Sequence, residues 1–169
     1  MPYEKIDIRD IENPVKLIAD RWALLSAGTP KDWNTMTVSW GAIGEIWGFD
    51  AVFAFVRPQR HTMQYMDASD YFTLAFGLPR ETLALCGKIS GKDCDKIARA
   101  GLTVHAECDA VWPEGATLAI VCRKAAKQAI DPAGFIDPGI EGNYNGDYHS
   151  MFVGEIVGVY RATGELRLN

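Results

Sequence analysis

Short apolar segments rich in aromatic and β-branched residues recur along this chain, and they constrain its fold more than any other feature. They lie at residues 22–27, 35–40, 51–56 and 71–76, and two longer ones lie at 117–129 and 151–160. Segments with this length and composition favour strands over helices. Within 35–40, hydroxyl and apolar residues alternate, as they do in a strand between two environments. The sequence therefore predicts a mainly β fold.

Helices are expected to be few and short. One is predicted at 13–19, because Pro14 would stand at the first helical position, where a missing N–H does no harm. Others are predicted at 62–68 and at 90–100; the second of these begins with a capping-box pattern, and Gly101 would end it. Many strands with a few short helices predict a β-barrel carrying helical insertions.

Composition narrows the class of protein. With 169 residues, 48% of them apolar and 23% charged, and with no repeat or linker, the chain is expected to form a single globular domain over 1–169. A net charge of −5 argues against a nucleic-acid partner. The sequence contains no apolar run long enough to span a membrane, and its polar first residues do not resemble a signal peptide, so a cytoplasmic location is expected.

The cysteines do not suggest a metal site. They stand at positions 86, 94, 108 and 122, without the close pairs or neighbouring histidines that zinc sites show. In a reducing compartment such residues are packed or idle thiols rather than disulfides. We therefore expect no bound metal.

The segment 34–41 is the first candidate for a binding site. If it is a strand, Thr35, Thr37 and Ser39 lie on one face, about 6–7 Å apart in succession. A row of hydroxyls can follow the polar rim of a flavin ring, where N3–H, O2, O4 and N5 alternate as donors and acceptors. The simpler interpretation is a half-exposed strand with its hydroxyls in water, and this segment alone favours it.

A second candidate is the segment 57–62, which lies between a predicted strand and a predicted helix. Arg57, Arg60 and Thr62 could form a cradle for a phosphate, since arginine grips phosphate through paired hydrogen bonds and a helix N-terminus adds unpaired N–H groups. Ordinary surface arginines would produce the same pattern, and the segment alone does not decide between the two interpretations.

The third candidate is His149, which follows the Gly-, Pro-, Asp- and Asn-rich stretch 131–147 and precedes a predicted strand. Long loops of this kind often act as lids, although a packed surface excursion fits equally well. His105, in contrast, is expected to be a partly buried strand residue. No histidine is placed for a catalytic triad, and no nucleophile elbow occurs.

A glycine- and lysine-containing segment at 87–93 resembles a P-loop, but its spacing is wrong. The P-loop requires four residues between its glycines and a hydroxyl residue after its lysine. Here three residues separate Gly87 from Gly91, and Asp93 follows Lys92. The sequence therefore gives no support for nucleotide triphosphate hydrolysis.

Taken together, these segments resemble the flavin-reductase-like family of FMN-binding split barrels, and in particular its flavoredoxin-like branch. The resemblance spans about residues 20–160 and is carried by the segments 34–41, 57–62, 70–76, 86–96 and 148–156. It implies a six-stranded antiparallel Greek-key barrel with short helical insertions. It also implies a homodimer with FMN bound near the subunit interface.

The resemblance also implies roles for individual residues. Thr37, Val38 and Ser39 would face the isoalloxazine ring, partly through backbone groups, and the same segment adds Thr35, Met36 and Trp40 to the expected cofactor-binding set. The phosphate would be held by Arg57, Arg60 and Thr62, and the ring or ribityl chain would lie near Phe76, Ser90 and Lys92. His149 would border a nicotinamide pocket. Many members carry a small residue at the position of Trp40. The larger tryptophan of this chain would narrow the space above the flavin.

The expected function is that of an FMN-dependent oxidoreductase that takes a hydride from NAD(P)H and passes electrons to a second acceptor, either a small molecule or a protein. In such proteins the cofactor carries the redox chemistry and the protein positions it. An FMN electron carrier reduced by a protein partner is the alternative, and a non-catalytic FMN-binding module is a third.

Overall fold

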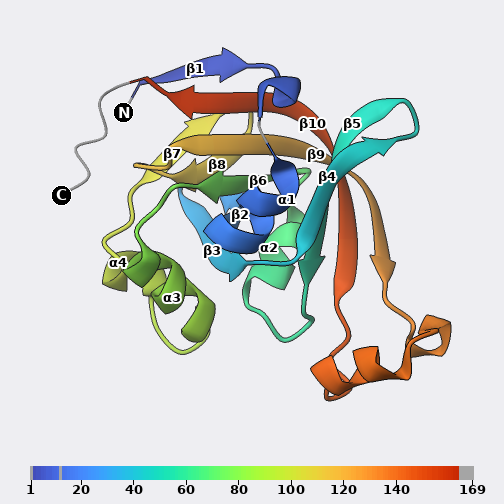
Figure 1. Ribbon diagram of the computed structural model, residues 1–169. Helices are drawn as coiled ribbons and strands as arrows, with labels where there is room; N and C mark the ends of the chain where they lie inside the picture. Colours follow the sequence, from blue (N-terminus) through green and yellow to red (C-terminus); the bar gives the residue numbers. More distant parts are fainter. Residues whose placement is uncertain (1, 12, 164–169) are drawn as a thin grey trace.

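The computed structural model describes residues 2–11 and 13–163, and within them eight strands form one antiparallel sheet (Figure 1). The order is β3-β2-β6-β9-β10-β5-β4, and β1 pairs with the end of β10. The strands are β1 (Tyr3–Ile6), β2 (Ala23–Thr29), β3 (Asp32–Val38), β4 (Gly41–Ile46), β5 (Phe49–Val56), β6 (Tyr71–Phe76), β9 (Leu118–Ala129) and β10 (Ser150–Ala162). A separate hairpin contains β7 (Val104–Glu107) and β8 (Ala110–Pro113). The predicted mainly β fold is confirmed.

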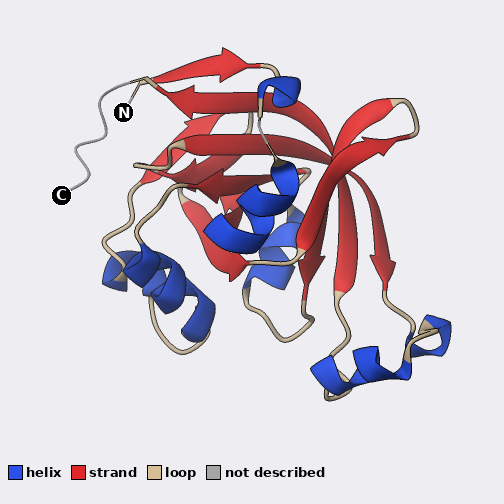
Figure 2. Cartoon of the chain, viewed as in Figure 1, coloured by secondary structure: helices blue, strands red, loops and turns tan. Residues whose placement is uncertain are grey.

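The two edge strands of this sheet, β3 and β4, are consecutive in the chain. Only Ser39 and Trp40 separate them, so the sheet must curl until its edges approach each other there (Figure 2). Among the described residues no ladder joins β3 to β4, and the barrel is therefore split along this line. We call the junction at Ser39 and Trp40 the seam.

Hydrophobic residues fill both faces of the central strands. One cluster, inside the barrel, includes Leu25, Phe72 and Ile120, all at most 1% exposed. The residues that alternate with them point the other way, and there the second cluster packs around Trp112 of the β7–β8 hairpin and Leu83 of helix α3 (Arg80–Lys88). Burial on both faces makes β2, β6 and β9 the most constrained part of the fold.

Strand β10 connects the seam side of the barrel to the chain terminus. Its first half pairs with β5, from Ser150 opposite Val56, and its second half pairs with β1. Register shifts at Val153/Gly154 and Ile156/Gly158 bend the strand between these partners. Because β10 starts at Ser150, its geometry fixes the preceding His149 beside the end of β5.

The helices match the predictions only in part. Helix α2 (Thr62–Ala68) has the predicted bounds. The predicted helix 13–19 is a short α1 (Pro14–Lys16) that continues as a π-helix, η2 (Leu17–Arg21). Among all the residues that the structure describes, no helix is long and apolar enough to cross a membrane.

The helix predicted at 90–100 starts later than expected. The hydroxyl of Ser90 accepts a hydrogen bond from the backbone N–H of Lys92 and forms a turn. Helix α4 (Lys96–Arg99) begins only after Asp95, whose carboxylate accepts from the N–H of Ala98. The resemblance implies six strands, whereas the described residues form ten, eight in the main sheet and two in the β7–β8 hairpin.

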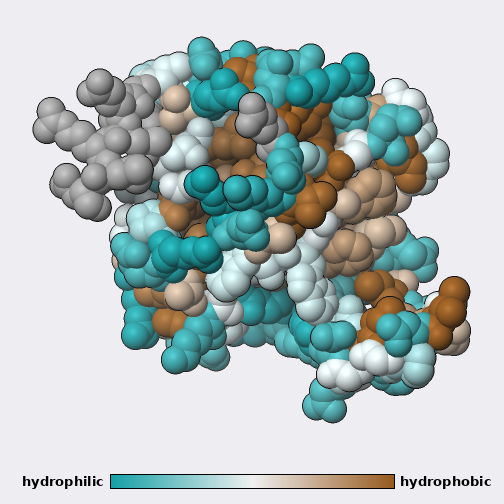
Figure 3. Space-filling view, in the orientation of Figure 1, coloured by the Kyte–Doolittle hydropathy of each residue, from teal (hydrophilic) through white to brown (hydrophobic). Residues whose placement is uncertain are grey.

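The stretch 131–147 is an ordered excursion between β9 and β10. Two short 3-10 helices, η3 (Pro132–Gly134) and η4 (Pro138–Asn143), give it regular structure, and aspartates cap both. Apolar atoms show at its surface (Figure 3), where Ile136 is 99% exposed and Ile140 is 40% exposed. We refer to residues 131–147 as the excursion.

The four cysteines are free thiols, and among the described residues no group of side chains could hold a metal ion. Burial raises the pKa of both the Cys86 and Cys122 thiols.

Candidate functional site

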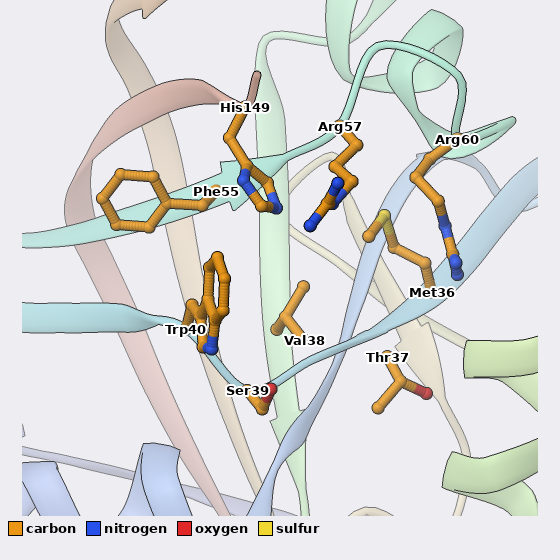
Figure 4. Close-up of a pocket in the computed structure, with 9 residues that line it drawn as sticks. All are labelled: Met36, Thr37, Val38, Ser39, Trp40, Phe55, Arg57, Arg60 and His149. Carbon is orange, nitrogen blue, oxygen red and sulfur yellow. The ribbon is translucent and has the colours of Figure 1, made fainter. Parts of the chain in front are cut away.

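A cavity of about 200 Å³ opens at the seam of the barrel (Figure 4). It brings together the end of β3, the seam itself, the end of β5 and the start of β10. The lining residues are Met36, Thr37, Val38, Ser39, Trp40, Phe55, Arg57, Arg60 and His149. Eight of these nine belong to the site predicted from the sequence, and only Phe55 was not foreseen.

Strand β3 offers its backbone to the cavity. It pairs with β2 along one edge only, so alternate N–H and C=O groups on its other edge have no strand partner within the described residues. The hydroxyl of Thr37 donates to the carbonyl of Leu83, which fastens β3 to helix α3. The end of β3 is thus a fixed row of donors and acceptors.

Arg57 is held by the excursion. Its guanidinium forms an ion pair with Asp147, donates to the carbonyl of Asn143 at 2.9 Å, and lies 5.1 Å from the centre of the Tyr144 ring. Asp147 also accepts from Gln59 at 2.6 Å. The backbone N–H of Asn145 and then the Arg57 and Gln59 side chains hold the pKa of the Asp147 carboxyl well below its usual range. This carboxylate therefore stays ionised and balances the charge of Arg57.

Arg60 lies on the opposite side of the cavity from Trp40 (Figure 4). It donates to the carbonyls of Gly87 at 2.8 Å and Cys86 at 3.1 Å, at the end of helix α3. Burial lowers its pKa, and the nearby Arg57 lowers it further. Both interactions are with neutral carbonyls, and among the described residues no carboxylate forms an ion pair with Arg60.

His149 packs into a group of aromatic rings. Its Nδ1 lies 3.1 Å from the hydroxyl of Tyr144, and its ring centre lies 5.2 Å from that of Trp40 and 6.3 Å from that of Phe55. Burial, with a smaller effect from Arg57, lowers the pKa of His149 to about 4. The imidazole is therefore neutral near pH 7, and it can donate a hydrogen bond through one nitrogen while the other interacts with Tyr144.

A second cavity of about 380 Å³ contains a buried lysine. Its lining includes Asn34, His61, Gly91, Cys94 and Lys96. Lys96 is only 2% exposed, and no ion pair with it is found among the described residues. Burial, together with repulsion from Arg60, lowers the pKa of Lys96 to about 8. An anion bound in this cavity would stabilise the protonated, positively charged form of Lys96, which burial disfavours.

Sequence reasoning named Lys92 and missed Lys96. Lys92 is exposed in the turn that precedes Asp95, whereas Lys96 is the first residue of α4 and faces inward. Nothing in the sequence marks a lysine as buried, because its position depends on where α4 begins and on the packing of the loop at 89–95.

Several other predicted residues lie outside the seam cavity. Thr35 is fully buried, and its hydroxyl bonds to Ser26 and to the Leu25 carbonyl. Of the three hydroxyls predicted on one face, only those of Thr37 and Ser39 belong to residues that line the cavity. Thr62 is also fully buried and accepts from Asn34 at 2.8 Å, Phe76 lies in the barrel core, and Ser90 forms the turn before α4.

Comparison with known families decides what kind of domain this is. The family model described as "Flavin reductase like domain" matches residues 16–168. The chain belongs to this family. No curated protein sequence gives a significant match.

Solved structures support the flavin reductase-like fold. An FMN-binding domain of a flavin reductases-like enzyme from Shewanella baltica superposes with a TM-score of 0.67 at 15% identity, covering 95% of this chain and 77% of that one. A flavoredoxin from Methanosarcina acetivorans gives 0.65 at 21% identity, with 94% and 76% covered. An NADH:FAD oxidoreductase from Streptomyces globisporus, solved with NAD and FAD fragments, gives 0.61 at 14%, with 84% and 74% covered.

Proposed function

We propose that this flavin reductase-like domain binds FMN and works as an oxidoreductase that takes a hydride from NAD(P)H and passes electrons to a second acceptor. The observation that carries the proposal is the pair of cavities: a slot at the seam beside the open edge of β3, and a second cavity with a buried, unpaired lysine. FMN combines one planar ring with one phosphate, and the two cavities suit these two parts.

The seam cavity suits the ring. The backbone at the end of β3, from Met36 to Ser39, alternates donors and acceptors, as the rim of the isoalloxazine does. A volume of about 200 Å³ is below the roughly 300–1,000 Å³ of most ligand pockets, so one chain would enclose only part of the ring. The remainder would lie against solvent or a second subunit.

The second cavity suits the phosphate. Lys96 supplies a buried cation, and no ion pair with it is found among the described residues, although Asp32 and Asp95 also line this cavity. Arg60 lines the seam cavity, and its charge also acts on Lys96. We therefore assign the phosphate to Lys96 and Arg60. Arg57, named from the sequence for the same role, is already balanced by Asp147. Since the described residues form one such anion site, we propose FMN rather than FAD as the cofactor.

The protein's own part in the reaction is to position the reactants. FMN, when bound, supplies the hydride and electron transfer chemistry. Neutral His149 holds one nitrogen against Tyr144 and would use the other to orient a nicotinamide at the open side of the cavity. The Trp40 ring lies beside it and would cover part of a ligand bound there.

An FMN electron carrier is the second candidate function, and the exposure of Trp40 favours it. The Trp40 ring is 47% exposed at the mouth of the cavity, within 5.2 Å of the His149 ring, and it narrows the space for a nicotinamide. The likeness to a flavoredoxin is consistent with this alternative.

Two measurements test the proposal. The protein purified from a reducing cytoplasm should be yellow and should release FMN rather than FAD when it is denatured. Anaerobic titration with NADH and NADPH should bleach the flavin absorbance. Bound FMN that neither nucleotide reduces would select the carrier, and a preparation that binds no flavin after incubation with FMN would refute the proposal.

We also propose a homodimer on which the flavin site depends. Trp47 is 63% exposed, Val15 is 75% exposed and Trp40 is 47% exposed, which leaves large apolar side chains for an interface to cover. Sedimentation at micromolar and nanomolar protein, followed at the flavin wavelength, should show a dimer that loses flavin as it dissociates. A monomer that retains its flavin would contradict the proposal.

A further inference from the structure

The side of the seam cavity away from Arg60 is built from aromatic rings and carries no net charge. Trp40, Phe55 and Tyr144 surround the ring of His149, with centre-to-centre distances of 5.2, 6.3 and 5.5 Å. Tyr144 also packs against Trp40 at 6.5 Å. Figure 4 shows the Trp40, Phe55 and His149 side chains together on this side of the cavity, next to Arg57. We call it the aromatic side.

Arg57 would make this side positive if its charge were not balanced by a carboxylate from the excursion. Asp147 forms an ion pair with the guanidinium, while the carbonyl of Asn143 occupies a second guanidinium nitrogen. The face of Tyr144 covers the guanidinium at 5.1 Å. Two of the five N–H groups of Arg57 are therefore committed to the excursion.

Asp147 is itself held firmly in place. It accepts hydrogen bonds from Gln59 at 2.6 Å and from the backbone N–H of Asn145 at 2.9 Å, in addition to its pair with Arg57. Arg57 and Gln59 both follow β5, whereas Asp147 belongs to the excursion, so this network closes the excursion onto the rim of the cavity. Because three donors hold its carboxylate, Asp147 has a fixed position at the rim and differs from an isolated ion pair on the surface.

These contacts determine which molecules the aromatic side can accept. An anionic ligand would approach a guanidinium whose charge is already balanced by Asp147 and two of whose five N–H groups are used, so little net attraction would offset the loss of its hydration. A flat, uncharged ring would lose little hydration and would stack against Trp40 and His149. The neutral imidazole can donate one hydrogen bond to a carbonyl or amide oxygen on such a ring.

We infer that Asp147 determines the charge specificity of the flavin site: by neutralising Arg57 it restricts the aromatic side to flat, uncharged rings, either a free aromatic or conjugated molecule or the reduced nicotinamide of a larger ligand. The inference rests on the proposed function, in which FMN occupies the β3 side and its reaction partner the aromatic side. It adds the class of that partner and names a specificity-determining residue outside the cavity lining.

Benzamide and benzoate test the inference, since they share one ring and differ in charge. Calorimetry on the FMN-loaded protein should detect benzamide binding, with benzoate at least about tenfold weaker. In Asp147→Asn, Arg57 is freed, and benzoate should gain about 10- to 100-fold in affinity through one charge-assisted contact. The matched control Glu141→Gln removes a carboxylate from the same excursion without touching Arg57 and should leave the preference unchanged.

The double variant Arg57→Gln, Asp147→Asn separates a released arginine from a loosened excursion. If Arg57 binds the benzoate, the gain seen in Asp147→Asn disappears in the double variant while benzamide still binds. A gain that persists there, the same gain in Glu141→Gln, or equal binding of both probes to the wild type would overturn the inference. A changed FMN affinity in Asp147→Asn would also overturn it, because Arg57 would then belong to the cofactor.

Calorimetry detects the two probes without any flavin signal. If the protein binds no FMN, which is the result that refutes the proposed function, the same titrations on the apoprotein still compare Asp147→Asn with the double variant and show whether Arg57 binds benzoate. The two failures remain distinguishable.

Discussion

Replacing Lys96 with glutamine should remove most of the affinity for FMN and also its dependence on pH. Lys96 is 2% exposed, and burial followed by repulsion from Arg60 lowers its pKa to about 8. A phosphate bound beside it would favour the charged form and raise the pKa again. Binding of FMN should therefore be coupled to protonation of this one lysine.

The magnitude follows from the pKa of about 8 in the unbound protein. About nine-tenths of Lys96 would be protonated at pH 7 and about one-tenth at pH 9. Only the protonated form attracts the phosphate, so the affinity of the wild type should fall about tenfold over this interval. The phosphate itself is already a dianion there. Since a charge-assisted hydrogen bond contributes roughly 1.5–3 kcal/mol, Lys96→Gln should weaken binding at pH 7 about 10- to 100-fold.

Quenching of FMN fluorescence on titration with apoprotein, repeated from pH 6.5 to 9.5, measures both effects. Lys88→Gln removes an exposed lysine from the end of helix α3 and serves as the control. Lys92→Gln shows whether the lysine predicted from the sequence contributes to FMN binding: its affinity should be unchanged if Lys96 holds the phosphate. A pH dependence that survives in Lys96→Gln would refute the reasoning and assign the proton to another group.

The remaining predictions concern the other parts of the site and the barrel. Arg60→Ala should weaken FMN binding about 10- to 100-fold in the same titration, and unchanged affinity would remove Arg60 from the phosphate site. His149→Ala should retain FMN but slow its reduction by NAD(P)H in stopped-flow absorbance; an unchanged rate would make His149 structural. Gly154→Ala should lower the free energy of unfolding in urea by about 1–3 kcal/mol, because a Cβ there would lie 2.5 Å from the Phe72 ring. Gly44→Ala, with nothing within 4 Å, is its control, and equal losses would contradict the packing argument.

Elements whose own residues favour their secondary structure could be predicted from the sequence. The strand at 71–76 and the helix at 62–68 were predicted with the bounds that the structure gives, because local composition and spacing determine them. Strand β1 has no such signal. Tyr3–Ile6 is a polar segment that becomes a strand only because it pairs with the end of β10, which no local pattern reveals.

The same distinction between local patterns and contacts of distant segments explains which site residues could be predicted. Thr37 and Ser39 could be predicted from alternation along one strand, which is a local property, whereas Met36, Val38 and Trp40 were expected only from the family resemblance. Thr35 lies on the predicted face but is fully buried by its neighbours, and Phe55 joins the cavity only because β5 ends beside β10. The partner of Arg57 could not be foreseen either, since Asp147 reaches it from an excursion far along the chain.

The position of β10 between β9 and β5 affects how the chain can fold during its synthesis. Until residues 150–162 leave the ribosome, β5 has no neighbour on one side, and the β4–β5 hairpin is separated from the rest of the sheet. An unpaired strand edge can associate with other chains, so the nascent protein is exposed to aggregation until β10 is made. This strand closes the barrel and also places His149 at the seam, and flavin binding is therefore expected to begin only after β10 has been synthesised.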